Sequence, residues 1–221
     1  MSTPLVPKRS RHCFLLPLVL CALLPLVLCS CASLLDPGPP PARIQLSPTM
    51  PGPLMSKPLN KQVVVAMPQA GRDIDTDGIA LLFNNREIRH LSGARWASPV
   101  PQMLQRELID ALTATNGLRG VAGESAGIAA DARLLCDIRQ FSLRYASAEA
   151  IPTAVLTATF RLLDLSSGAI LDTKNVSIEV PATGRDNAAV AVSGETVLSR
   201  CLAEVAPWVV HTLDGRRTDA R

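Results

Sequence analysis

The sequence predicts an α+β domain in which an antiparallel or mixed β-sheet carries two amphipathic helices packed on one face. Three observations lead to this prediction. Two segments, near residues 100–115 and 187–213, repeat apolar residues every three or four positions, which is the period of a helix. Three consecutive segments between residues 134 and 180 alternate apolar and polar side chains, as strands do. Short turns join these strands, which favours an antiparallel meander.

The chain begins with a stretch typical of an export signal, a basic start followed by an apolar run from Cys13 to Leu28. The run is shorter than the roughly 18 residues that a transmembrane helix needs, and two prolines interrupt it. Leu28-Cys29-Ser30-Cys31 resembles a bacterial lipobox. We therefore expect a lipoprotein signal peptide over residues 1–30 and acylation of Cys31, for example with palmitate. A signal that is cleaved elsewhere is the main alternative.

The remaining chain divides into a tether, one domain and a tail. Residues 31–60, beginning with the lipidated Cys31, are rich in proline and are expected to form an extended tether. A single α+β domain is expected over residues 61–214, with a polar tail at 215–221. Removing the three basic residues of the signal leaves 19 basic residues against 19 acidic ones, so the mature chain has no excess charge for a nucleic-acid partner.

The first half of the domain begins with a buried strand at residues 63–67. A hairpin is expected at 79–83 and 87–91, because Asn84-Asn85-Arg86 suits the positive φ of a tight turn. A helix with a stripe of leucines follows, with Ser98 as the expected N-cap and Asn116-Gly117 as its left-handed end.

The second half begins with a short strand at 118–121 and continues with the meander. The alternation changes phase within residues 134–145, which predicts a β-bulge near Arg139 and Gln140. Two more strands follow, over 153–162 and from Ile170 to 180. The closing helix is expected to begin near Asn187 with Asp186 as its cap, and Pro207 is expected to kink it or end its regular part.

One short motif suggests catalysis. Gly123-Glu124-Ser125-Ala126-Gly127 fits the G-x-S-x-G pattern of α/β-hydrolases, and His211 follows it in the chain. The parallel βαβ units that such an elbow requires are not predicted, and His211 falls in an apolar helix. We therefore expect no catalytic residue and no enzyme activity; a small serine esterase that uses Ser125 is the least favoured alternative.

Neither a metal site nor a cofactor is expected. Asp73, Asp75 and Asp77 alternate like ligands of a calcium loop, but the distal glutamate of such a loop is missing. Cys136 and Cys201 are the only cysteines left after the signal and the lipidated residue. They are too few for a metal site, and either form a disulfide or remain as two buried thiols.

The order of these parts is similar to that of a known family. An Ile44-Gln45-Leu46-Ser47-Pro48 start precedes the first strand, and Arg95-Trp96-Ala97-Ser98-Pro99 leads into a helix that contains Gln105-Arg106-Glu107-Leu108. With the lipobox and the closing helix that carries Trp208, the chain resembles the ABC-type transport auxiliary lipoprotein family. This family includes the paraquat-inducible protein C type.

The resemblance implies a non-enzymatic, lipid-anchored protein of the cell outer membrane whose domain faces the periplasm. Its implied partners are an MCE-domain protein and an inner-membrane ABC permease and ATPase, and its implied role is docking in lipid transport between membranes and in envelope integrity. Ala32 after Cys31 agrees with the outer membrane. Trp96 is the candidate anchor for the partner, although a tryptophan at this position equally suits the core. A homo-oligomer, a direct lipid-binding carrier and a purely structural envelope lipoprotein remain open alternatives.

Overall fold

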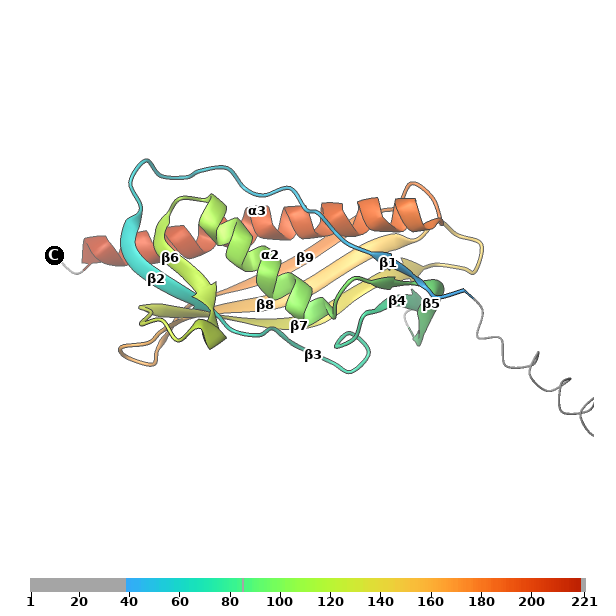
Figure 1. Cartoon of the computed structure of the whole chain (residues 1–221), viewed down its shortest axis with the longest axis horizontal. Helices are drawn as coiled ribbons and strands as arrows, with labels where there is room; N and C mark the ends of the chain where they lie inside the picture. The colour runs from blue at the N-terminus through green and yellow to red at the C-terminus, as the bar shows by residue number, and fades with distance from the viewer. Residues whose placement is uncertain (1–38, 85, 220–221) are drawn as a thin grey trace, which may run out of the picture. The chain divides into compact units, whose positions relative to one another are not determined.

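The computed structural model describes residues 39–84 and 86–219, and its folded unit begins at Pro41. Helix α2 (Val100–Ala114), the 3₁₀ turn η3 (Glu124–Ala126) and helix α3 (Asn187–Asp219) accompany the strands of one mixed sheet. The predicted α+β class is confirmed (Figure 1). The strands are β1 (Ala42–Ile44), β2 (Leu59–Val65), β3 (Gln69–Ala70), β4 (Gly78–Phe83), β5 (Glu87–Trp96), β6 (Leu118–Gly123), β7 (Ala132–Tyr145), β8 (Thr153–Asp164) and β9 (Ile170–Pro181).

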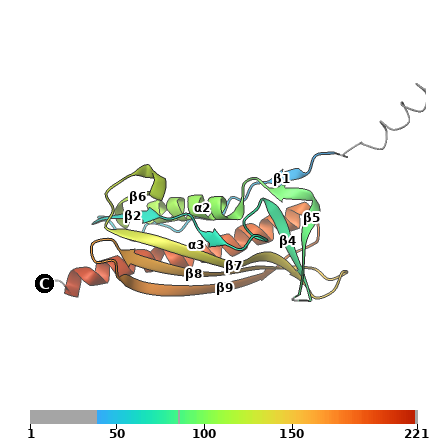
Figure 2. The ribbon, with the colours of Figure 1, turned by 90° about the horizontal axis from the view of Figure 1, so that it is seen from below.

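The sheet is organised around β7. One edge of β7 pairs with β8 in the antiparallel sense, and β8 pairs in the same sense with β9, as the predicted meander requires. The other edge is shared by three strands that run parallel to β7: β2 beside residues 132–134, β3 beside 137–138 and β4 beside 143–145. Strand β2 leads on to β6, whereas β4 leads on to β5 and β1. Beyond β7 the sheet therefore divides into two arms (Figure 2).

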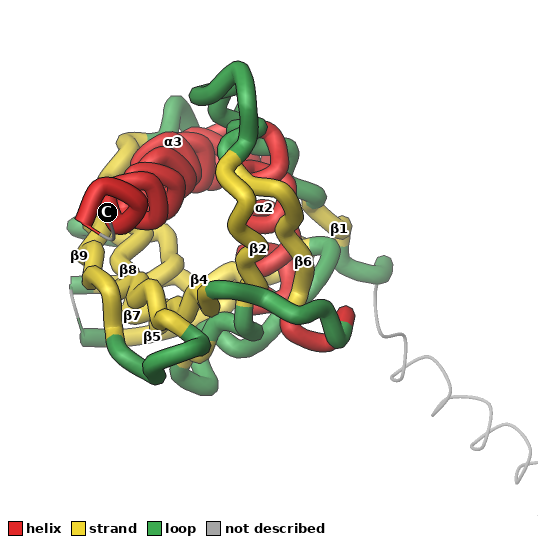
Figure 3. Tube along the Cα trace, turned by 90° about the vertical axis from the view of Figure 1, so that its left-hand side faces the viewer, coloured by secondary structure: helices red, strands yellow, loops and turns green. Residues whose placement is uncertain are grey.

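The two helices bury the apolar face of this sheet. Helix α3 packs along β8 and β9, and α2 packs against β2, β6 and α3. Seen along α3, the strands curve round from β9 through β8 and β7 toward β2 and β6 (Figure 3). The stripe of α3 is fully buried, and it meets the inward residues of β8 in one continuous core. These inward residues are Ala154, Leu156, Ala158, Phe160 and Leu162, the face expected from the alternation.

The expected boundary of the domain at residue 61 differs from the structure. Residues 45–58, which we term the strap, cross α3 and the end of α2 between β1 and β2 (Figure 1). The strap donates backbone hydrogen bonds from Ser47 to Glu195 (3.1 Å) and from Thr49 to Ser199 (2.8 Å). Leu46 is 2% exposed. The proline-rich composition predicted an extended chain correctly, but apolar side chains along it bind that chain to the fold, so the tether does not extend to residue 60.

Several local predictions are confirmed. The ladder between β7 and β8 shifts register between Ile138 and Gln140, where the bulge was expected. Asn84 and Asn116 have φ values of 49° and 48°, the left-handed conformation that asparagine tolerates. The Asp186 carboxylate accepts a hydrogen bond from the backbone N–H of Ala189 (2.8 Å), as the N-cap of α3 should.

Other local predictions are wrong. The N-cap of α2 is Pro99, without a side-chain hydrogen bond, rather than Ser98. Helix α3 continues past Pro207 to Asp219, so the expected polar tail is helical through residue 219. Val205 and Val209 flank Pro207 and are fully buried. Their packing holds the helix in place where a proline removes one backbone hydrogen bond.

Candidate partner-binding edge of the sheet

Strand β9 forms a long edge of the sheet. It pairs with β8 from Ile170 to Pro181, and no other strand of the described residues pairs with it. Its outer edge therefore presents backbone N–H and C=O groups in a row to which a strand of another protein can add. With 12 residues, β9 is longer than the strands at the ends of the two arms, β1 with 3 and β6 with 6 residues.

The first half of β9 is fixed by side chains of α3. The indole Nε1–H of Trp208 donates to Oδ2 of Asp172 at 2.7 Å, and Lys174 forms an ion pair with Glu204 at 3.6 Å. The Trp208 hydrogen bond lowers the pKa of Asp172, and the backbone N–H of Thr173 lowers it further. These contacts hold the beginning of the strand against the helix.

The second half of β9 is held from its opposite face. Arg144 of β7 donates to both carboxylate oxygens of Glu179 across β8. This hydrogen-bonded ion pair lowers the pKa of Glu179 and raises that of Arg144. Thr159 donates to Asn175 at 2.9 Å on the same outward face. The result is an edge with a polar outward face whose side chains are already paired, which reduces the ordering cost of adding a strand.

The polar residues of this edge were not predicted as a site. Asp172 and Lys174 occupy the inward positions of the alternation that continues through Val176 and Ile178. Polar residues at inward positions need partners on the covering helix, so their presence in the sequence could have indicated contacts between β9 and a helix. The partner Trp208, in contrast, belongs to a different element, and its spacing in the chain does not reveal the contact.

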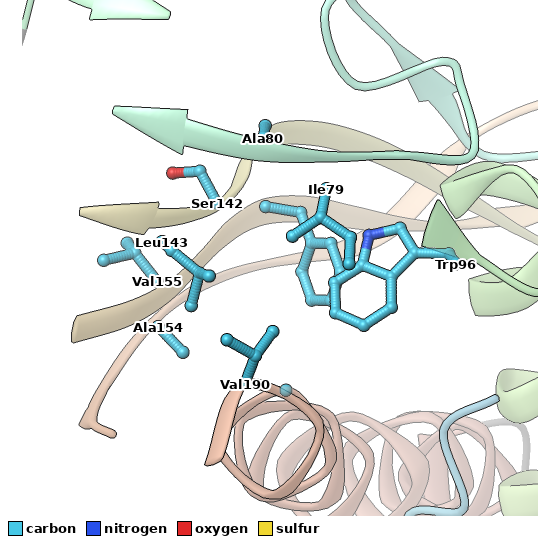
Figure 4. Close-up of a pocket in the computed structure, with 10 residues that line it drawn as sticks. Ile79, Ala80, Trp96, Ser142, Leu143, Ala154, Val155 and Val190 are labelled. Atoms are coloured by element: carbon cyan, nitrogen blue, oxygen red, sulfur yellow. The ribbon is translucent and has the colours of Figure 1, made fainter. Parts of the chain in front are cut away.

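The expectation for Trp96 as an exposed anchor is wrong. Trp96 is 4% exposed and packs against Phe141, with ring centroids 5.7 Å apart. It lines a small cavity of about 10 Å³ between the sheet and α3, together with Ile79, Leu143 and Val190 (Figure 4). A side chain in this position stabilises the core and is closed to a partner in this conformation.

The structure has Cys136 and Cys201 as free thiols, so the disulfide considered from the sequence is not formed in it. Both side chains are buried between β7 and α3, at 4% and 0% exposure. Burial raises the pKa of Cys136 well above its usual range and that of Cys201 to about 12. Both groups are therefore neutral, unreactive thiols at physiological pH. Cys31 lies outside the described residues.

Ser125 lies in η3 and is exposed, and Gly127, two residues later in the chain, has a φ of 65°. Among the described residues, no hydrogen bond connects Ser125 to His211 or to a carboxylate. His211 is exposed on α3. The structure therefore does not assemble the nucleophile and base that the G-x-S-x-G pattern suggested. Within residues 39–84 and 86–219, no three His, Cys, Asp or Glu side chains gather as metal ligands would.

Comparisons with known proteins agree with this fold. The family model described as "ABC-type transport auxiliary lipoprotein component" matches residues 45–206. A Xanthomonas campestris protein of the DUF330 family has a solved structure that is similar, with a TM-score of 0.73 and 26% sequence identity over 81% of this chain and 99% of that one. A second solved structure, of an uncharacterized protein, aligns with a TM-score of 0.59 and 15% identity over 79% and 99% of the two chains. The search of curated proteins finds no match.

Proposed function

Because the chain belongs to the ABC-type transport auxiliary lipoprotein component family, we propose that it is the non-enzymatic docking component of an ABC-type transport system. The single observation that supports this role is the family match, which extends from the strap at residue 45 to residue 206 within α3. It therefore includes strands β2 to β9, helix α2 and the first part of α3, so the family relationship concerns most of this fold rather than one motif of it.

The finer parts of the proposal follow from the N-terminal sequence and from the family resemblance. Cys31 carries the lipid that anchors the protein to the outer membrane, with the domain in the periplasm. Within the described residues, no helix is long and apolar enough to cross a membrane. The partner is an MCE-domain protein of a transport system that an inner-membrane ABC permease and ATPase energise. The cargo is lipid. Cys31→Ala should release the protein from the membrane fraction; a variant that stays anchored contradicts lipidation at Cys31.

The β9 edge is the surface on which the partner docks in this proposal. Its backbone groups supply hydrogen bonds to an added strand, and the Arg144–Glu179 pair keeps the neighbouring side chains in place. Ile170 is exposed at the beginning of this edge, at 55%. It gives an added strand an apolar contact there.

The test is purification of the protein from its own cells after gentle solubilisation, with a photo-crosslinking amino acid placed at Ser177, which is exposed on β9. A matched control carries the same group at Thr113, which is exposed on α2. We expect an MCE-domain protein and an ABC permease to co-purify, and the crosslink to form at Ser177 only. Co-purification without a Ser177 crosslink rejects the β9 edge, whereas no co-purification rejects the docking role itself.

A further inference from the structure

The sheet has an interruption beside β7. Strand β3 pairs with residues 137–138 of β7 and β4 pairs with residues 143–145, so within the part of the chain that the structure describes residues 139–142 have no strand partner on this edge. The β-bulge between Ile138 and Gln140 lies in the same place. A bulge disrupts the ladder and redirects side chains, so the two arms of the sheet separate here. We call this interruption the seam.

Two hollows meet at the seam. A cleft of about 170 Å³ lies beside it, with Ile74, Leu82 and Ile88 among its walls. The cavity of about 10 Å³ that Trp96 lines is the second. The two share Ala80, Phe141 and Ser142, which therefore stand between them.

Residues of both faces of the sheet line the small cavity. Phe141 and Leu143 belong to the core that α3 covers. Ser142 stands between them in the strand and therefore projects from the opposite face. The small cavity therefore lies in the core at the seam, and Ala80, Phe141 and Ser142 line both it and the cleft.

The indole nitrogen of Trp96 determines which kind of ligand atom this cavity prefers. Trp96 is 4% exposed, and among the described residues no group accepts a hydrogen bond from its Nε1–H. Figure 4 shows the nitrogen on the ring edge that is turned toward Ile79, at the cavity. Buried donors of this kind are almost always paired in native proteins. The remaining walls are mainly apolar, which disfavours an ion and favours a neutral acceptor.

We propose that the seam is a binding site for one uncharged oxygen atom that accepts the hydrogen bond of Trp96 Nε1–H. The cavity of about 10 Å³ is at the lower limit of the space that a single water molecule needs. The adjoining cleft is lined by apolar Ile74, Leu82 and Ile88 and by polar Asp73, Arg139 and Gln140. Its apolar walls also suit the chain of a short alcohol, whose hydroxyl oxygen takes the same position. Water and an alcohol share the acceptor chemistry, and the experiment distinguishes them.

The experiment is NMR spectroscopy of the full protein with ¹⁵N-labelled indoles, first in water and then with increasing 1-butanol. The chain has only two tryptophans, and Trp208 is an internal control because its Nε1–H is already bound to Asp172. Trp208→Phe assigns the two signals. We expect a cross-peak between water and the Trp96 Nε1–H, and a saturable shift of the Trp96 signal with 1-butanol while the Trp208 signal stays in place.

The outcomes separate the two sources of oxygen. A water cross-peak that persists at saturating 1-butanol assigns the site to water. Loss of that cross-peak together with a shift of the Trp96 signal assigns it to the alcohol as well. A Trp96 signal with neither a water cross-peak nor a response to 1-butanol overturns the proposal, and the Trp208 signal shows in the same sample that the protein is folded.

Discussion

Leu46 offers the sharpest test of whether the strap belongs to the fold. Its side chain is 2% exposed, and its methyl groups lie against Gly194 of α3, 3.4 and 3.5 Å from the position that a Cβ would take there. Truncating a fully buried leucine to alanine costs about 2–5 kcal/mol, depending on how far the surroundings collapse. Because the strap lies at the surface and is able to relax, we expect Leu46→Ala to lower the free energy of unfolding by about 2–3 kcal/mol.

The expected loss is large enough to measure by thermal unfolding. For a domain of this size, 1 kcal/mol lowers Tm by about 2–4 °C, so Leu46→Ala should lower it by about 4–12 °C. Leu54→Ala is the matched control, because Leu54 lies in the same strap but is 40% exposed. We expect this variant to lower the free energy of unfolding by less than about 1 kcal/mol. If the strap were a free tether, both variants would have the Tm of the wild type. Equal melting temperatures of all three proteins would therefore refute the reasoning.

Three further predictions concern the packing and the titrating groups. Gly194→Leu should destabilise the protein by about 1–3 kcal/mol through overpacking, and Gly194→Ala should stay near wild type; denaturant midpoints of the pair test this. The pKa of Asp172 is lower in the folded than in the unfolded state, so its contribution to stability is complete above the unfolded value of about 4 and is lost as pH falls through the folded pKa. Unfolding curves of Asp172→Asn and wild type should therefore differ at pH 7 and converge once the pH is below that folded pKa. Cys136 and Cys201 should resist alkylation at pH 8 in the native protein and react after denaturation, as peptide mass spectrometry would reveal; rapid native labelling would contradict their burial.

The elements that the sequence predicted well are those with a local cause. The faces of β8 follow from strict alternation, and the bulge in β7 follows from a change of phase within one strand. Asn84 and Asn116 end their elements because asparagine tolerates a positive φ. In each case the neighbouring residues in the chain determine the result, so the pattern is visible without the fold.

The features that sequence reasoning missed depend on distant partners. From its sequence the strap is indistinguishable from a proline-rich linker. Only the structure shows that Leu46 packs against Gly194, about 150 residues further along the chain. Trp96 was considered for a surface role because a tryptophan before a helix suits both core and surface, and only its contact with Phe141 decides between them. The β9 edge appears only when the pairing of every other strand is known, because no local signal says which strand of a sheet is last.

The central position of β7 has a consequence for the order in which the protein acquires its structure. Strands β2, β3 and β4 emerge from the ribosome first, yet each takes part of its pairing from a strand that begins only at Ala132. More than half of the chain must therefore be made before the central ladder can close, although the outer ladders β1–β5, β4–β5 and β2–β6 can form earlier. Such dependence on non-local pairing slows folding and exposes intermediates to aggregation. We therefore expect chains that are truncated before Tyr145 to remain unfolded rather than to form a smaller stable sheet.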